Sequence, residues 1–439
     1  MNKSVTSRGE RLTYGGYFWG QNFILIIVLQ FLMIFYTDVV GLSAASAGLI
    51  FLIARIWDAV NDPIMGIIVD KVSFKNGEKF KPWITAVIFL LPLATILLFM
   101  NPASSMTGKL TWAFITYILW GMIYTVSDIP IFALATVMTG NQDERVRIIS
   151  VGRLAAGIGA LVGVIIITPL TVTLGWTPAI IIVALIAMAV MLPLKFKAVE
   201  RISYQRDSST SMKEMFKGLL KNRYLMLIYA VIIISNLTNT GSATIVYFVK
   251  YNLGNEMLIP MISLAGASSA ILLPIFLPKL IRIFGKRMLF LLLMSISIVS
   301  SILFYFIGYS SLPLVFIFIA LKYMALNLPI LMMAMFTSDC LEYGYSRTKK
   351  RNEGIVFSVQ TFSIKMTLAL QGIMGAFALA RAGYAANQVQ STEVLNEIWR
   401  MNTLYPVAGQ IVAVVLFYFF YKLSESRVAK LVVAGSDGQ

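Results

Sequence analysis

Apolar residues dominate twelve stretches of the chain, and shorter polar stretches separate them. A helix needs about 20 apolar residues to cross the hydrocarbon core of a bilayer, so each stretch predicts a membrane helix. A polar segment after the sixth stretch divides them into two sets of six. The predicted helices cover residues 14–37, 46–70, 83–101, 110–139, 145–172, 177–195, 223–250, 257–281, 287–308, 313–339, 354–380 and 400–423.

The pattern predicts an all-α membrane protein built from two six-helix bundles. We place an N-terminal bundle at residues 1–194, a cytoplasmic central loop at 195–222, and a C-terminal bundle with a short cytoplasmic tail at 223–439. The chain is 58% hydrophobic and 13% charged, which does not fit a soluble globular protein. No cleavable signal peptide is expected, because the residues up to Arg11 are polar and the apolar run after them is too long.

Basic residues predict the orientation in the cell inner (plasma) membrane. With both termini cytoplasmic, 28 of the 36 Lys and Arg residues lie in inside segments, which is the positive-inside pattern. The net charge of +16 therefore needs no nucleic-acid partner. Outside segments hold four basic residues, Lys109, Lys250, Arg381 and Arg400, and the apolar stretches hold Arg55, Arg153, Lys322 and Lys365.

The second helix carries the clearest candidate chemistry. A charged group near the bilayer centre costs roughly 2.5–3.5 kcal/mol and marks a functional site by default. Asp58, Asn61 and Asp62 are spaced by three and four residues and therefore share one helix face. Two carboxylates and an amide suit a hard cation such as Na⁺ or Li⁺, whereas a proton would need only one carboxylate. The chain has no histidine, so any ion coupling must use carboxylates.

Arg55 offers a plainer interpretation of this cluster. It lies one turn before Asp58, and an internal ion pair would merely neutralise the helix. One arginine does not balance two carboxylates, however, and the excess negative charge favours a bound cation. On the fourth helix, Thr125 either completes the cation shell or makes a hydrogen bond that packs two helices together.

The fourth helix also carries candidate sugar ligands. Asp128 lies one turn after Thr125, with Tyr124 and Phe132 as neighbouring aromatic residues. A carboxylate accepts hydrogen bonds from sugar hydroxyls, and an aromatic ring stacks on the apolar face of a pyranose. Polar residues at mid-helix depth come from both halves of the chain, as in transporters that bind substrate near the midplane: Asn22, Asp58, Asp128, Arg153, Lys322 and Lys365.

These residues resemble a known family along nearly the whole chain. The sequence is similar to the glycoside-pentoside-hexuronide:cation symporters of the major facilitator superfamily. The most specific matches are Tyr36–Leu42, Arg55–Pro63, Tyr124-Thr125 with Asp128-Ile129-Pro130, and Asp339, Glu342, Tyr343 and Gly344 before Glu353-Gly354. The resemblance implies the twelve-helix fold of that superfamily and alternating-access transport of a sugar or glycoside with a cation.

The resemblance also implies roles for individual residues. Residues matching Asp58, Asn61, Asp62 and Thr125 form the Na⁺ site of the family, which favours Na⁺ over H⁺ as the coupling ion, with Li⁺ and H⁺ as the alternatives. The sugar site of its best-known member matches Asn22, Asp128, Phe132, Arg153, Gln360, Thr361 and Lys365, and we add Tyr124 as a neighbour. No other cofactor is expected.

Two positions depart from that pattern. Asn22, preceded by Gln21, replaces an acidic residue, and Phe132 replaces a tryptophan. The loss of one acid leaves Arg153 and Lys365 facing fewer carboxylates, so we expect a different sugar, and one with an anionic group such as a uronate or a sulfosugar. In the plainer alternative, the two cations only balance Asp128 and the acids of the second helix.

Three other features have no assigned role in the resemblance. Lys322 is either a substrate ligand or a side chain that snorkels to the membrane surface. Polar residues from Asn236 to Gly241 interrupt the seventh helix and fit either a broken, cavity-lining gate or polar helix packing. Gly152, Gly157, Gly159 and Gly163 on the fifth helix predict a close helix crossing.

A secondary transporter is the function class that fits best. Its expected partners are a small sugar and the lipid bilayer, with no obligatory protein partner. A lysolipid transporter of the same lineage would need an apolar lateral cleft, whereas the polar midplane favours a hydrophilic solute. A membrane sensor should carry a soluble signalling domain. An enzyme or primary pump is disfavoured because the sequence contains no Walker-type glycine loop.

Overall fold

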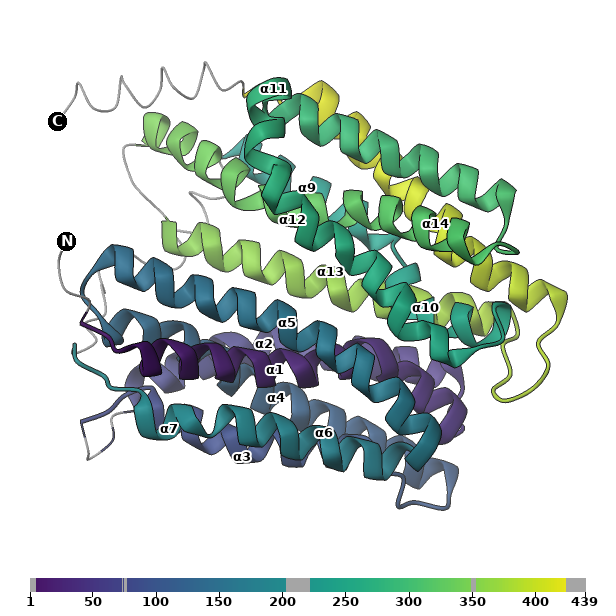
Figure 1. Cartoon of the computed structure of the whole chain (residues 1–439), viewed down its shortest axis with the longest axis horizontal. Coiled ribbons are helices and arrows are strands. Elements are labelled where there is room, and N and C mark those ends of the chain that lie inside the picture. The colour runs from purple at the N-terminus through teal and green to yellow at the C-terminus, as the bar shows by residue number, and fades with distance from the viewer. Residues whose placement is uncertain (1–4, 73, 75–76, 203–221, 349–352, 424–439) are drawn as a thin grey trace. The chain divides into compact units, whose positions relative to one another are not determined.

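The computed structural model describes residues 5–72, 74, 77–202, 222–348 and 353–423. Over these ranges all regular secondary structure is helical, and all twelve predicted apolar stretches lie in helices (Figure 1). The predicted all-α class is therefore confirmed. Nine of the helices in this part of the chain are long and apolar enough to cross a membrane.

The chain forms two compact units. The first comprises Met1–Arg206 with Glu256–Pro260 and Tyr384–Val389, and the second comprises Asp207–Asn255, Met261–Gly383 and Gln390–Gln439. The sequence boundary between them falls in the polar central segment. The loop piece Tyr384–Val389 joins the first unit through hydrogen bonds from the Tyr384 hydroxyl to the Asp38 carboxylate and from the Asn387 amide to the Asp38 main-chain carbonyl.

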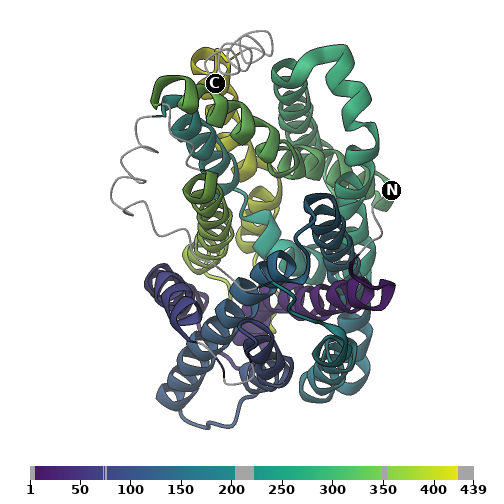
Figure 2. The same cartoon turned by 90° about the vertical axis from the view of Figure 1, so that its left-hand side faces the viewer.

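The part of the first unit within residues 5–202 contains six long helices and two short elements. They are α1 (Arg8–Ile34) continued by η1 (Phe35–Val39), α2 (Ala44–Lys71), α3 (Lys81–Leu98), α4 (Met106–Met138), α5 (Gln142–Leu174), α6 (Trp176–Met191) and α7 (Pro193–Lys197). Figure 2 views these helices, coloured purple to teal, from one end.

Side-chain caps explain why several of these helices begin where they do. The Ser7 hydroxyl accepts a hydrogen bond from the Glu10 main-chain N–H, and the Glu10 carboxylate accepts one from the Ser7 main-chain N–H. These two hydrogen bonds form a capping box at the start of α1. Ser43 and Ser105 cap α2 and α4 in the same way, with one hydrogen bond each. At the start of α3 the Glu200 carboxylate accepts three consecutive main-chain amides, those of residues 79–81.

Close approach of α1 and α5 organises the first unit. A Cβ atom on Gly159 would lie 2.2 Å from the Trp19 carbonyl oxygen, and one on Gly163 would lie 2.9 Å from the Phe23 carbonyl oxygen. Gly152 faces the rings of Tyr14 and Phe18. The predicted close crossing is confirmed at these three glycines, but it is wrong for Gly157, which has no atom within 4 Å of an added Cβ.

The second unit contains the remaining helices. They are α9 (Arg223–Leu237), α10 (Gly241–Tyr247) continued by η2 (Phe248–Asn252), α11 (Ile259–Ile307), α12 (Leu312–Thr348), α13 (Glu353–Arg381) and α14 (Thr392–Phe420), while the short η3 (Glu256–Leu258) belongs to the first unit. The two predicted helices at 257–281 and 287–308 join in α11 across a kink at Gly285, whose φ is 71°. The predicted break in the seventh helix is confirmed, because α9 ends at Leu237 and α10 begins at Gly241.

An aromatic cluster holds one end of the second unit together. Phe290, Phe336, Phe417 and Tyr421 pack with ring centroids 4.4–5.8 Å apart. Such offset and edge-to-face ring pairs contribute beyond their buried area.

Candidate functional site

The second helix brings its carboxylates against α4. Asp62 accepts a hydrogen bond of 2.7 Å from the Thr125 hydroxyl, and Thr125 also donates to the Gly121 carbonyl of its own helix at 3.1 Å. One turn earlier on α2, the Asp58 carboxylate lies beside Gly121, where a Cβ atom would be 3.2 Å from its Oδ1. The two carboxylates of α2 therefore both face α4, and Asn61 shares their helix face by its spacing of three and one residues.

Arg55 engages the same cluster from the same helix. Its Nη1 donates to Asp58 Oδ2 at 2.8 Å, and its Nη2 donates to the Tyr117 hydroxyl at 2.8 Å. The ion pair that the sequence offered as a plainer interpretation is thus present. This ion pair involves one arginine and one of the two carboxylates of the cluster.

Of the four predicted cation ligands, Asn61 and Thr125 are the most buried, each 3% exposed. Among the residues that the structure describes, no group accepts a hydrogen bond from Asn61 Nδ2. A buried polar atom without a partner costs about 1–3 kcal/mol. Because the amide oxygen and nitrogen are assigned only from their contacts, turning the amide over would present Oδ1 instead, which is a ligand for a hard cation.

A second group of predicted residues surrounds Asp128 on α4. Gln21 is fully buried, and its Nε2 donates to the Ser127 hydroxyl at 2.9 Å and lies 3.5 Å from Asp128 Oδ1. Ser127 also shares a 2.8 Å hydrogen bond with the Tyr17 hydroxyl. The Asn22 amide instead donates to the Phe18 carbonyl of its own helix at 3.0 Å. The structure therefore brings Gln21, rather than Asn22, to Asp128.

Phe132 and Arg153 form the aromatic and cationic part of this group. The Arg153 guanidinium lies 4.8 Å from the centroid of the Phe132 ring, whose other neighbour is Phe18 at 5.2 Å. Arg153 is exposed and forms no ion pair with a side chain that the structure describes. Tyr124 stacks on Trp120 with centroids 5.2 Å apart. The expectation that Arg153 only balances Asp128 receives no support from these contacts.

Four further predicted residues belong to the second unit. Gln360, Thr361 and Lys365 fall on α13, but their side chains are not among those that the structure describes. Lys322 on α12 is 1% exposed, so the expectation that it snorkels to the surface is wrong. It lies in the second unit, where it approaches Gly241 so closely that an added Cβ would be 2.8 Å from its Nζ.

The partner of Lys322 is a main-chain carbonyl. Its Nζ donates to the Asn402 oxygen at 2.7 Å. Four residues later α14 contains Pro406, which has no N–H to donate to that oxygen. The ammonium thus takes the place of the missing helical hydrogen bond, and no described carboxylate pairs with it.

Sequence reasoning missed two contributors. Tyr117 precedes Gly121 and Thr125 by four and eight residues, so the helical period alone would have placed it on the face that meets α2. Ser127 joins Tyr17 to Gln21, but it lies on a different face of α4 from Thr125 and no spacing pointed to it.

The chain belongs to the MFS/sugar transport protein family, whose pattern matches residues 17–425. The resemblance to sugar symporters of the major facilitator superfamily and the predicted fold are confirmed, and so is the expectation that the chain is not an enzyme. The protein is thus a multi-pass membrane transporter.

Named relatives align over almost the full chain. The putative glycoside/cation symporter YagG of Escherichia coli (strain K12) is 29% identical and covers 95% of this chain and 93% of its own length. The glucuronide carrier protein homolog of the same strain is 29% identical and covers 99% of this chain and 96% of its own length. The crystal structure of the nucleoside transporter NupG matches with a TM-score of 0.67 at 15% identity, covering 94% of this chain and 99% of that one, which shows the fold alone.

Proposed function

We propose that this protein is a Na⁺-coupled symporter that moves an anionic sugar across the inner membrane by alternating access, with both termini cytoplasmic. The observation that carries the proposal is the set of oxygen-bearing side chains on one face of α2, namely Asp58, Asn61 and Asp62. Of these, Asp62 accepts a hydrogen bond from Thr125 on α4, and Asp58 pairs with Arg55. The names of relatives as a glycoside/cation symporter and a glucuronide carrier homolog support the same class.

The coupling ion follows from the ligand types. The four residues offer carboxylate, amide and hydroxyl oxygens, and hard monovalent and divalent cations prefer such ligands in numbers greater than one. A proton would need only one carboxylate, and its binding would give the buried Asn61 amide no ligand to contact. We therefore assign Na⁺ to this site, with Li⁺ as the closest chemical substitute and H⁺ as the alternative to be tested.

The sugar site follows from the second group. Asp128 accepts sugar hydroxyls, Phe132 and Tyr124 supply aromatic faces, and Arg153 receives a carboxylate or sulfonate of the substrate. Arg153 suits this role because its guanidinium rests on Phe132 and is exposed, with no described acid occupying it. We retain Asn22, Gln360, Thr361 and Lys365 as further proposed sugar ligands.

Uptake by purified protein in proteoliposomes tests the proposal. Separate Na⁺, Li⁺ and H⁺ gradients are imposed while a panel of neutral glycosides, uronates and sulfosugars is screened. We expect Na⁺ to accelerate uptake of an anionic sugar, and we expect Asp58→Cys and Asp62→Cys to abolish the acceleration while sugar binding persists. Glu78→Gln, which removes an acid from the loop before α3, is the matched control. Equal Na⁺ stimulation in both cysteine variants would overturn the cation assignment, and competition by neutral glycosides alone would overturn the anionic substrate.

A further inference from the structure

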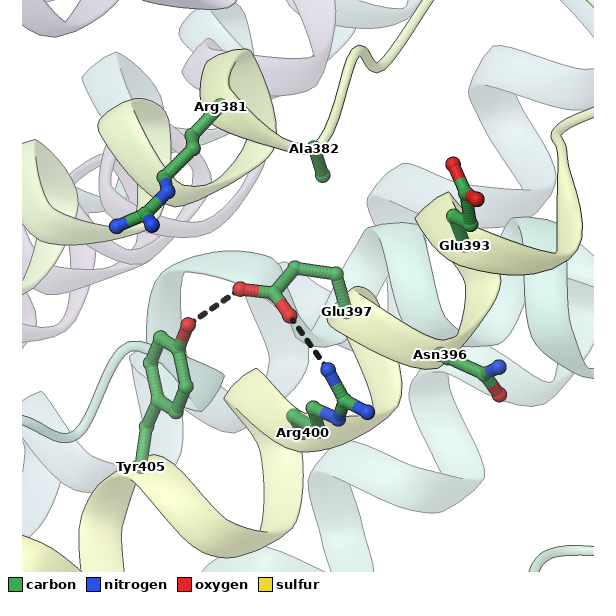
Figure 3. A pocket seen from close by; sticks show the side chains of 7 residues that line it. All are labelled: Arg381, Ala382, Glu393, Asn396, Glu397, Arg400 and Tyr405. Carbon is green, nitrogen blue, oxygen red and sulfur yellow. Dashed lines mark hydrogen bonds and ion pairs between the residues drawn. The ribbon is translucent and has the colours of Figure 1, made fainter.

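A pocket of about 490 Å³ opens in the second unit, where α13 ends and α14 begins. Its size falls in the range of small-molecule sites. Figure 3 shows Arg381 at the end of α13 on one side of the pocket and Glu393 on the first turn of α14 on the other, with Glu397 between them. Asn396, Arg400 and Tyr405 complete the polar lining.

The centre of this pocket is internally paired. The Tyr405 hydroxyl donates to the Glu397 carboxylate, and Arg400 lies 3.7 Å from the same carboxylate. Glu397 and Arg400 therefore offset each other. Arg381, Glu393 and Asn396 make no hydrogen bond or ion pair with the described side chains. The pocket consequently has a cationic end, an acidic and amide end, and a Tyr405 ring in its wall.

Arg381 is unusual among the basic residues predicted to lie outside the cell. The positive-inside rule makes such residues scarce, and three of the four have a partner. Lys109 donates to the Val40 carbonyl at 2.8 Å, Lys250 lies 5.3 Å from the centroid of the Tyr251 ring, and Arg400 pairs with Glu397. Arg381 makes no such direct contact with the described side chains, and it interacts electrostatically with Tyr405 across the pocket.

We propose that this pocket is an outer capture site for a polyhydroxylated carboxylate of hexuronate size, which it holds before transport. Arg381 receives the carboxylate in a bidentate, charge-assisted contact. Glu393 and Asn396 bind the hydroxyls, and the sugar ring lies against Tyr405. This site is distinct from Asp128 and Arg153, and the proposal rests on the proposed function in taking the substrate to be an anionic sugar and α13–α14 to join outside the cell.

Direct binding to the full-length purified protein tests the outer site apart from the central one. D-glucuronate and D-glucose are matched probes, since they differ only in the carboxylate. The central site is removed with Asp128→Asn and Arg153→Ala together, and calorimetry then measures what still binds. We expect D-glucuronate to bind this double variant, with D-glucose at least about tenfold weaker.

Adding Arg381→Ala should weaken D-glucuronate binding about 10- to 100-fold, because a hydrogen-bonded ionic contact is lost. Arg282→Ala, which removes an exposed arginine of α11, is the control and should leave binding unchanged. No binding in the double variant, equal binding of the two sugars, or equal effects of the two arginine substitutions would each overturn the outer site. If wild type takes up no sugar in any cation gradient, the proposed function fails, whereas these binding results still decide the outer site.

Discussion

The two units treat ionic groups inside their helices in different ways. In the first unit Asp58 and Asp62 contact side chains, namely the guanidinium of Arg55 and the hydroxyl of Thr125. In the second unit Lys322 contacts a main-chain carbonyl, that of Asn402. The side-chain partners of the first unit, Arg55 and Thr125, have other rotamers open to them. The partner of Lys322 is fixed by the helix that carries it.

This contrast distinguishes ionic residues proposed to bind a ligand, Asp58 and Asp62, from one that stabilises a helix contact, Lys322. In the proposed function the carboxylates of the first unit bind a cation, whereas Lys322 donates to a carbonyl that has no helical donor because residue 406 is proline. A buried ionisable residue in a membrane helix is by default a functional candidate. Our proposal applies this default to the aspartates and not to Lys322, because the aspartates contact side chains whereas Lys322 contacts a main-chain carbonyl.

The largest expected effect concerns the two cations Arg153 and Lys322. Arg153→Ala should lower the apparent affinity of uptake for D-glucuronate about 10- to 100-fold and should change that for a neutral glycoside much less, because only the anionic group loses its charge-assisted bonds. Competition uptake assays measure both. Lys322→Met is the matched control, and a similar loss of selectivity in it would erase the distinction between the two residues.

The two units should respond alike when a glycine at a close helix contact is replaced by alanine. Such a result would show that the units differ in how they pair ionic groups and not in how tightly their helices pack. A Cβ on Gly159 of the first unit would lie 2.2 Å from a carbonyl oxygen, and one on Gly409 of the second would lie 2.3 Å from the Ile234 carbonyl oxygen. Substitution of either by alanine should destabilise the protein by about 1–3 kcal/mol through overpacking. Thermal unfolding in detergent measures this. Gly157→Ala on the same helix as Gly159 should be near neutral, and a loss as large as that of Gly159→Ala would contradict the packing argument.

Thr125 and Thr116 offer a sharper test within one helix. The Thr125 hydroxyl donates to Asp62, whereas the Thr116 hydroxyl donates at 2.7 Å to the Trp112 carbonyl of its own helix. Thr125→Ala should raise the Na⁺ concentration for half-maximal uptake about tenfold, in line with the loss of one bond to a charged group. Thr116→Ala should leave it unchanged. Indistinguishable Na⁺ titrations of the two variants would exclude Thr125 from the cation shell.

The smallest expected effect is the coupling between Lys322 and Pro406. Lys322→Met leaves the Asn402 carbonyl without a partner, but Pro406→Ala restores a helical N–H for it. The two substitutions should therefore be non-additive by about 1 kcal/mol, with Lys322→Met less harmful when alanine occupies position 406. A double-mutant cycle of unfolding free energies gives this value. Strict additivity of the two unfolding free energies would mean that the Lys322 ammonium does not replace the hydrogen bond that Pro406 cannot donate.

Much of the fold was predictable because membrane helices can be recognised in a sequence by the length and hydropathy of their apolar stretches. The twelve apolar stretches, the break before Gly241 and three of the four close-packing glycines of α5 follow from local pattern. The separation of stretches 257–281 and 287–308 follows too, because Gly285 has a non-helical backbone at the kink between the two helical parts of α11.

The candidate site was predictable where spacing on one helix decides it. The spacing of Asp58, Asn61 and Asp62 places them on one face of α2. The same helical spacing, counted back along α4 from Thr125 by two steps of four residues, would have added Tyr117. The choice between Gln21 and Asn22 depends instead on how α1 is rotated against α4, which tertiary packing sets. The role of Lys322 depends on a proline 84 positions away on another helix, a relation that no local pattern contains.

Cation binding by the first unit is the central claim, and thermal stability measures it most directly. A ligand that binds only the folded protein raises its stability. Unfolding is followed in NaCl and in choline chloride of equal ionic strength for wild type, Asp58→Asn, Asp62→Asn and Lys322→Met. The account predicts that Na⁺ stabilises wild type and Lys322→Met but neither aspartate variant. Equal stabilisation of the aspartate variants, or its loss in Lys322→Met, would contradict it.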